Sequence, residues 1–194
     1  LHFLSNAATQ AFEDARESVR RFINAPSAEQ IIFTRNATEA INLVAQSWGR
    51  ANLAAGDEVL ITHMEHHSNQ TSWLETIADV VVIPADENGL FSINNFTKLV
   101  HQYKDRSFKI ASITSCSNVT GIRTPYHEVA KIMHQNNGVC FADFACSGPY
   151  VEINMHPEDK EAYLDAIFFS PHKFLGGPGS CGVMIFNKEL YRLT

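Results

Sequence analysis

Short apolar runs alternate with helical patterns along this chain from about residue 31 onward. This alternation constrains the fold most strongly, because it is typical of βαβ units, in which helices connect parallel strands and cover the sheet. It predicts an α/β domain with a mainly parallel, seven-stranded sheet and helices on both faces. Neither a repeat nor a linker interrupts the pattern, so residues 1–194 are expected to form a single domain.

The spacing of apolar residues predicts where the elements lie. Strands are predicted at residues 31–34, 58–62, 80–83, 109–114, 139–143, 166–170 and 182–186. Helices are predicted at residues 9–24, 38–53, 71–78, 93–103 and 126–136, of which the first is amphipathic and precedes an α/β core of residues 31–194. The loop Gly176-Gly177-Pro178-Gly179 is too tight for a crossover helix, so the last two strands are predicted to be antiparallel.

Composition and charge exclude several classes of protein. The net charge is −6 and no cluster of Lys and Arg is longer than two residues, which argues against a nucleic-acid binder. No apolar run approaches the ~20 residues that a bilayer requires, so no membrane partner is expected. The four cysteines lack the spacing of a metal site or a disulfide framework, and the first residues do not form a signal peptide. The expected compartment is therefore a reducing cytoplasm.

The residues that follow the strands are the candidate site, because an open α/β sheet binds ligands at the carboxyl ends of its strands. After the first strand, the turn at residues 36–38 opens directly into a helix. The N–H groups at the start of a helix favour an anion such as phosphate. The alternative is that Asn36 or Thr38 is a plain N-cap.

Three histidines, His63, His66 and His67, follow the second strand. His63 and His67 are four residues apart, which suits a metal on one helix face, but Met64 stands where a zinc protease helix needs Glu. We therefore expect no metal site. An imidazole that lies flat on an aromatic ligand fits a strand end better, with Asn69 capping the next helix.

Two further strand ends carry a carboxylate and an amine. Asp143 ends an apolar strand, and a buried carboxylate is costly unless it faces a cation, so it either faces a protonated ring nitrogen or caps an Asx-turn. Lys173 is flanked by Phe168, Phe169 and Phe174, which are expected to bury its stem. Burial lowers the pKa of a lysine, and the neutral amine attacks carbonyl groups. The alternative is an ordinary surface lysine.

Together these strand ends supply what pyridoxal phosphate requires. Lys173 would form the Schiff base, Asp143 would keep the pyridine nitrogen protonated, and His66 would stack on the ring. Residues of two loops would hold the phosphate: the turn at 36–38, Ser170 and His172.

The order and spacing of these motifs resemble those of the class V aminotransferase-like pyridoxal phosphate enzymes, and within them the cysteine desulfurases and selenocysteine lyases of the SufS and NifS type. The resemblance covers nearly the whole chain, through ATEAINLVA (37–45), GD (56–57), MEHHSN (64–69), SNVTG (117–121), Asp143 and SPHK (170–173). It implies a type I pyridoxal phosphate transferase fold in which Lys173 and His66 are catalytic. It also implies the full set of cofactor-binding residues: Ala37, Thr38, His66, Asn118, Asp143, Cys146, Ser170, His172 and Lys173.

The sequence departs from this family in length and at one position of the predicted site. Family chains are longer, so these residues are expected to be the large cofactor-binding domain, without the C-terminal small domain that supplies the nucleophilic cysteine and the arginine for the substrate carboxylate. Cys146 stands where desulfurases usually carry Gln or His, and a thiol is a weak hydrogen-bonding group. Cys116, Cys140 and Cys181 are expected to be buried. Ion pairing is the expected role of Arg35 and Arg123.

The leading hypothesis is a cysteine desulfurase-like enzyme that forms a Schiff base at Lys173, removes the Cα proton and cleaves the C–S bond. Fold and cofactor do not fix the reaction, so an aminotransferase, an epimerase or a β-lyase is the alternative, as is an inert domain of this fold. The resemblance implies a homodimer, a small amino-acid substrate and, for a desulfurase, a sulfur-acceptor protein.

Overall fold

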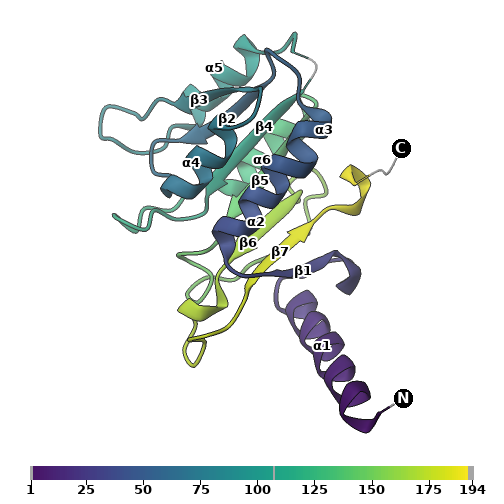
Figure 1. The fold of residues 1–194 in the computed structure, drawn as a ribbon. Coiled ribbons are helices and arrows are strands. Elements are labelled where there is room, and N and C mark those ends of the chain that lie inside the picture. The colour runs from purple at the N-terminus through teal and green to yellow at the C-terminus, as the bar shows by residue number, and fades with distance from the viewer. Residues whose placement is uncertain (1, 107, 192–194) are drawn as a thin grey trace.

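The computed structural model describes residues 2–106 and 108–191, and these residues form a seven-stranded sheet (Figure 1). The order of strands is β1-β7-β6-β5-β4-β2-β3. Their bounds are β1 Ile31–Thr34, β2 Glu58–Thr62, β3 Asp79–Ile83, β4 Lys109–Thr114, β5 Gly138–Asp143, β6 Ala166–Phe169 and β7 Gly182–Phe186.

The sheet is mainly parallel, as the sequence predicts. Strands β2 to β6 run parallel to one another, whereas β7 is antiparallel to β6, and β1 is antiparallel to β7. The predicted antiparallel pairing of the last two strands is therefore confirmed. Because two reversals separate β1 from β6, the carboxyl end of β1 lies at the same edge of the sheet as those of β2, β4, β5 and β6.

Helices connect most of these strands. Their bounds are α1 Phe3–Phe22, α2 Ala37–Leu43, α3 Arg50–Asn52, α4 His67–Leu74, α5 Ile93–Gln102 and α6 Tyr126–His134. A π-helical segment, Val44–Gly49, joins α2 to α3, so residues 37–52 are helical throughout, close to the predicted helix at 38–53.

Two helices begin earlier than the sequence predicts. Helix α1 starts at Phe3 rather than at residue 9, because the side chain of His2 caps it by accepting a hydrogen bond from the N–H of Leu4. Helix α4 starts at His67 and ends at Leu74, whereas the predicted helix spans 71–78. Its first two turns are polar, so the apolar spacing that marks a helix is missing from them.

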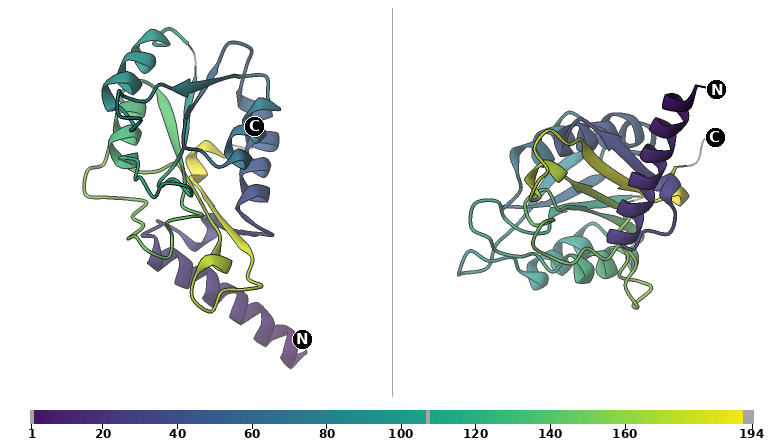
Figure 2. Two further views of the ribbon diagram at one scale, coloured as in Figure 1. Left: turned by 90° about the vertical axis from the view of Figure 1, so that its left-hand side faces the viewer. Right: turned by 90° about the horizontal axis from the view of Figure 1, so that it is seen from below.

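Helices cover both faces of the sheet, as predicted (Figure 2). Helices α2 and α4 pack on one face, where Ile41 and Trp73 belong to the same core as Phe141 of β5. Helices α5 and α6 pack on the other face, with Cys140 and Ala142 of the same strand. The alternation of β5 between two cores explains why the strand is apolar throughout: both of its faces are buried.

Helix α1 extends away from the sheet and has no buried residue (Figures 1 and 2). It contacts the body of the protein through single apolar side chains, such as Phe12, whose ring lies edge-on to Phe33 at 5.1 Å between centroids. Among the described residues, no helix combines the length and the apolar character that crossing a membrane requires.

Candidate active site

A cavity of about 240 Å³ lies at the carboxyl ends of β1, β2, β5 and β6. Seven of the nine residues predicted to bind a cofactor line it. The complete lining is Asn36, Ala37, Thr38, His66, Ser68, Asp143, Ala145, Ser170, His172 and Lys173.

The first wall of the cavity is the start of α2. Asn36 is the N-cap of this helix, since its Oδ1 accepts a hydrogen bond from the N–H of Glu39 at 2.8 Å. Gly182 of β7 packs against this turn so closely that a Cβ there would lie 2.4 Å from the carbonyl carbon of Asn36. A glycine is therefore required at position 182 so that the start of α2, with Ala37 and Thr38, can lie at the cavity.

His66 forms a second wall and caps α4. Its Nδ1 lies 3.2 Å from the N–H of Ser68, from which it accepts, and 2.8 Å from the hydroxyl of the same residue. Asn69, which the sequence suggests as the cap, is instead buried within the helix, and its amide donates to the carbonyl of Ser112 at 3.1 Å. His63 points elsewhere, with Nε2 3.0 Å from the carbonyl of Gly89. In the described part of the chain, no three His, Cys, Asp or Glu side chains are grouped as metal ligands.

Glu65, directly before His66, is a partly buried acid that sequence reasoning missed. Its carboxylate accepts from the hydroxyl and N–H of Thr62, from the N–H of Thr114 and from the amide of Asn69. Burial raises the pKa of Glu65 to about 7, although the hydroxyl of Thr62, the amide of Asn69 and the N–H of Thr114 oppose the shift. The signal available in the sequence was the same as for Asp143: an acid placed just after a buried strand.

Asp143 is buried at the end of β5 and faces the cavity. Its Oδ1 accepts from the N–H of Ala145 at 2.8 Å, so it does form the Asx-turn contact that the sequence suggests. Burial raises the pKa of Asp143, while this N–H and the nearby charges of Lys173 and His66 act in the opposite direction. Such a carboxylate becomes more acidic when a cation faces it.

Lys173 lies in a 3₁₀ turn, Pro171–Lys173, directly after β6. Its side chain lines the cavity but is exposed, which contradicts the prediction that aromatic residues bury its stem. Phe168 and Phe169 are buried in the sheet instead, because strand alternation and the turn after Ser170 direct them away from Lys173. Gly177 closes this turn, since a Cβ there would lie 1.9 Å from the carbonyl oxygen of Pro171.

Two predicted cofactor contacts do not line the cavity: Asn118, which is exposed, and Cys146, whose Sγ lies 4.0 Å from the carbonyl of Ser117. Cys140 is buried as predicted, and Cys116 is half-buried. Cys181 is exposed, contrary to the prediction, because β7 begins only at the next residue.

Arg35 forms an ion pair with Glu39, as expected, with Nε and Oε1 3.0 Å apart. No arginine is among the residues that line the cavity in the described part of the chain.

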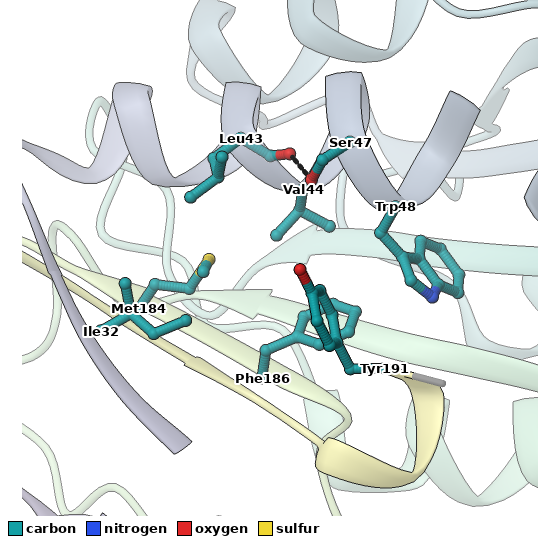
Figure 3. A pocket seen from close by; sticks show the side chains of 8 residues that line it. All are labelled: Ile32, Leu43, Val44, Ser47, Trp48, Met184, Phe186 and Tyr191. Atoms are coloured by element: carbon teal, nitrogen blue, oxygen red, sulfur yellow. Dashed lines mark hydrogen bonds between the residues drawn. The ribbon is translucent and has the colours of Figure 1, made fainter. Parts of the chain in front are cut away.

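A second cavity, of about 150 Å³, lies between the helical segment at 37–52 and strands β1 and β7 (Figure 3). Its lining is Ile32, Leu43, Val44, Ser47, Trp48, Met184, Phe186 and Tyr191. The hydroxyl of Ser47 donates to the carbonyl of Leu43, and the rest of the lining is mainly apolar apart from the hydroxyl of Tyr191. It offers no amine or carboxylate, and the first cavity is therefore the candidate active site.

Residues 1–193 match the family model described as aminotransferase class-V. The chain belongs to this family. It is 41% identical over 192 residues to a probable cysteine desulfurase from Halalkalibacterium halodurans, and 40% identical over 197 residues to a cysteine desulfurase from Synechococcus elongatus. These matches cover 97% and 100% of the chain, but only 45% and 30% of the two relatives. The chain thus spans less than half the length of these relatives.

Solved structures of class-V proteins share the fold. The cysteine desulfurase CsdA from Escherichia coli matches with a TM-score of 0.80 and 30% identity, over 98% of this chain and 47% of that one. The apo cysteine desulfurase from Thermococcus onnurineus matches with a TM-score of 0.86 and 29% identity, over 98% and 46%. The predicted type I fold of pyridoxal phosphate transferases is thereby confirmed.

The cofactor of this family is pyridoxal phosphate, and the donor set of the first cavity fits it. A primary amine, a buried carboxylate, an imidazole and the start of a helix converge on one space. These are the groups needed for an aldehyde, a ring nitrogen, a ring face and a phosphate, respectively.

Proposed function

We propose that this chain is the cofactor-binding domain of a cysteine desulfurase-like enzyme, which acts on a small amino acid with pyridoxal phosphate. The observation that carries the proposal is that Lys173 and Asp143, which lie 30 residues apart at the ends of two different strands, line the same cavity. The relatives at about 40% identity, which are named as cysteine desulfurases, support this choice of reaction.

Lys173 and Asp143 would carry out the central chemical steps of the reaction. Pyridoxal phosphate supplies an aldehyde that bonds to amines and a ring that takes up electron density from the substrate. The exposed amine of Lys173 can reach such an aldehyde in the cavity, and it can take or return a proton at the substrate Cα. The Asp143 carboxylate would face the ring nitrogen, where a cation offsets the cost of burying the acid.

The other lining residues would hold and orient the cofactor. Hydrogen bonds with Ser68 fix His66 at the start of α4, where its imidazole would stack on the ring. The start of α2, at Ala37 and Thr38, would bind the phosphate together with Ser170 and His172. Asn118 and Cys146 stay predictions as cofactor contacts, because neither lines the cavity.

The substrate, the dimer and the sulfur acceptor belong to the proposal as well. The larger relatives are named as cysteine desulfurases, so we propose cysteine as the substrate and cleavage of its C–S bond as the reaction. No arginine lines the cavity in the described part of the chain, so the proposal assigns the contact to the substrate carboxylate, and the nucleophile that accepts sulfur, to residues other than those that line it here. A homodimer and a sulfur-acceptor protein are the proposed partners.

The experiment that tests the reaction uses the whole protein loaded with pyridoxal phosphate and supplied with L-cysteine. We expect alanine and sulfide in equal amounts in the presence of a reductant, and we expect Lys173→Ala to abolish both products. Lys160→Ala, which alters an exposed lysine that does not line the cavity, is the matched control. Amino-group exchange with keto acids in place of sulfide would contradict the desulfurase reaction and favour an aminotransferase.

A further inference from the structure

Two cysteines that do not line the cavity, Cys116 and Cys146, lie just beyond the ends of neighbouring strands. Strands β4 and β5 are parallel, and their last pair is Thr114 with Asp143. Cys116 follows that pair by two residues and Cys146 by three. Neighbouring strands are about 4.8 Å apart, and the Cα atoms of a disulfide are about 4.4–6.8 Å apart. The two strand ends are therefore spaced within the range that a disulfide spans, and the cysteines follow these ends by two and three residues.

The two thiols converge on one atom. The Sγ of Cys116 lies 3.8 Å from the carbonyl oxygen of Ser117, and the Sγ of Cys146 lies 4.0 Å from the same oxygen. Burial raises the pKa of the Cys116 thiol, and the neighbouring thiol of Cys146 raises it further, which places the two side chains in contact. Cys140, by comparison, points to the carbonyl of Tyr126, with Sγ 3.9 Å away.

Adjacent residues hold the two segments together. The N–H and the hydroxyl of Ser115 donate to the carbonyl of Asp143 at 2.9 and 3.0 Å. The hydroxyls of Ser115 and Ser147 also hydrogen-bond to each other, and both residues are buried. Cys116 and Cys146 each stand next to one of these two serines, so the segments that carry the thiols are already fixed side by side.

We propose that Cys116 and Cys146 form a redox-active pair, which closes to a disulfide by exchange with a small-molecule disulfide. One thiolate attacks the small disulfide and releases a thiol; the second thiolate then attacks the mixed disulfide and releases the other. Two cysteine thiols are oxidised, one external disulfide is reduced to two thiols, and the two cysteine protons pass to the released thiolates. Both thiols are half-buried, so neither is closed to solvent.

The disulfide would act next to the candidate active site but does not depend on the proposed reaction. Ala145, whose N–H holds the Asp143 carboxylate, directly precedes Cys146. The bond would close a loop of roughly 30 residues that contains α6 and β5, and such a cross-link stabilises the folded state by restricting the unfolded chain. For a chain of this size, the expected rise in melting temperature is roughly 5–10 °C.

The test treats the reduced protein, without added cofactor, with oxidised glutathione and then maps the cysteines by mass spectrometry. We expect a peptide that links residue 116 to residue 146, the loss of these two thiols and the rise in melting temperature. Cys116→Ser and Cys146→Ser should leave the partner cysteine free or joined to glutathione, with no rise. Cys181→Ser alters an exposed cysteine outside the pair and should behave as the unaltered protein does.

Two results would overturn the proposal. The first is free or glutathione-bound Cys116 and Cys146, with no linked peptide, under conditions in which Cys181 reacts. The second is a linked peptide without any change in melting temperature. The melting temperatures of the reduced Ser variants separate a folding defect from the loss of the cross-link.

Discussion

Two buried aspartates at opposite ends of neighbouring strands differ in what surrounds them. Asp143 ends β5 and faces a cavity, and its carboxylate accepts a hydrogen bond from Ala145 alone among the described contacts. Asp165 precedes β6, and its Oδ2 accepts from His134 Nε2 at 2.8 Å and from the N–H of Cys140 at 2.9 Å. The first carboxylate is held ready for a ligand, and the second is already satisfied by the protein at this oxygen.

The comparison of these two residues shows that burial alone does not identify a functional acid. The imidazole of His134 also stacks on Tyr163, with ring centroids 4.0 Å apart, so the partners of Asp165 are fixed by packing. The cations near Asp143, by contrast, come from the exposed Lys173 and His66, which belong to the lining of an open cavity. We therefore assign a role in catalysis to Asp143, at the carboxyl end of the sheet, and a role in stability to Asp165, at its amino end.

The largest expected effect is the loss of catalytic turnover that Asp143→Asn should cause. The amide still accepts from Ala145 but cannot balance a cationic ring nitrogen, so turnover should fall by about 10²–10⁴-fold. The free energy of unfolding should change by less than about 1 kcal/mol, because no ion pair is removed. Steady-state kinetics and urea unfolding measure the two effects. Unchanged turnover with a large loss of stability would reverse the assignment.

The next effect is on stability and comes from Asp165→Ala. This change leaves His134 and the N–H of Cys140 without their acceptor, and breaking a buried pair costs about 3–5 kcal/mol. Binding of pyridoxal phosphate to the folded fraction should be retained. Chemical unfolding, with the visible absorption of the loaded protein as the second readout, tests both points. A fully stable variant would show that Asp165 does not anchor this end of the sheet.

Glu65 extends the comparison to a third acid, which is partly buried beside the cavity and is held by four donors. Its pKa is about 7 in the folded protein against an ordinary value of 4.5, so the folded state binds the proton more tightly. This contribution to stability is complete below pH 4.5 and is lost as the pH rises to 7, by about 3 kcal/mol. Glu65→Gln should remove that pH dependence in unfolding experiments; an identical profile for both proteins would contradict it.

The smallest effect is expected from His134. Burial lowers the pKa of its imidazole, but the hydrogen bonds and charges of Asp165 and Glu161 together outweigh burial, and the net pKa is raised. A raised pKa stabilises the fold at low pH, and the contribution disappears as the pH rises through the folded value. The advantage of the unaltered protein over His134→Gln should therefore shrink between pH 6 and pH 9. A constant difference would indicate that His134 contributes only through packing.

The sequence predicted the sheet closely and the helix starts less well. Apolar runs define strands such as β4 and β7, whose bounds agree with the prediction, because both faces of these strands are buried. The start of α4 was missed because it depends on a side-chain cap from His66, and a local hydrogen bond leaves no periodic signal.

The candidate site was predicted in its location but not in all of its physical detail. The convergence of Lys173 and Asp143 follows from the rule for strand ends, and the structure brings both to one cavity. The exposure of Lys173 could not be predicted, because it depends on how the turn at 171–173 directs the side chain. The network around Glu65 was also hidden, since its donors come from Thr62, Asn69 and Thr114, which meet only in the folded chain.

The most direct test of the central claim is to incubate the protein with pyridoxal phosphate, reduce it with borohydride and locate the added mass by peptide mass spectrometry. We predict a single labelled lysine, Lys173, together with a visible absorption band before reduction that Lys173→Ala lacks. A label on other lysines, or no label at all, would contradict the claim that Lys173 and Asp143 share one cofactor.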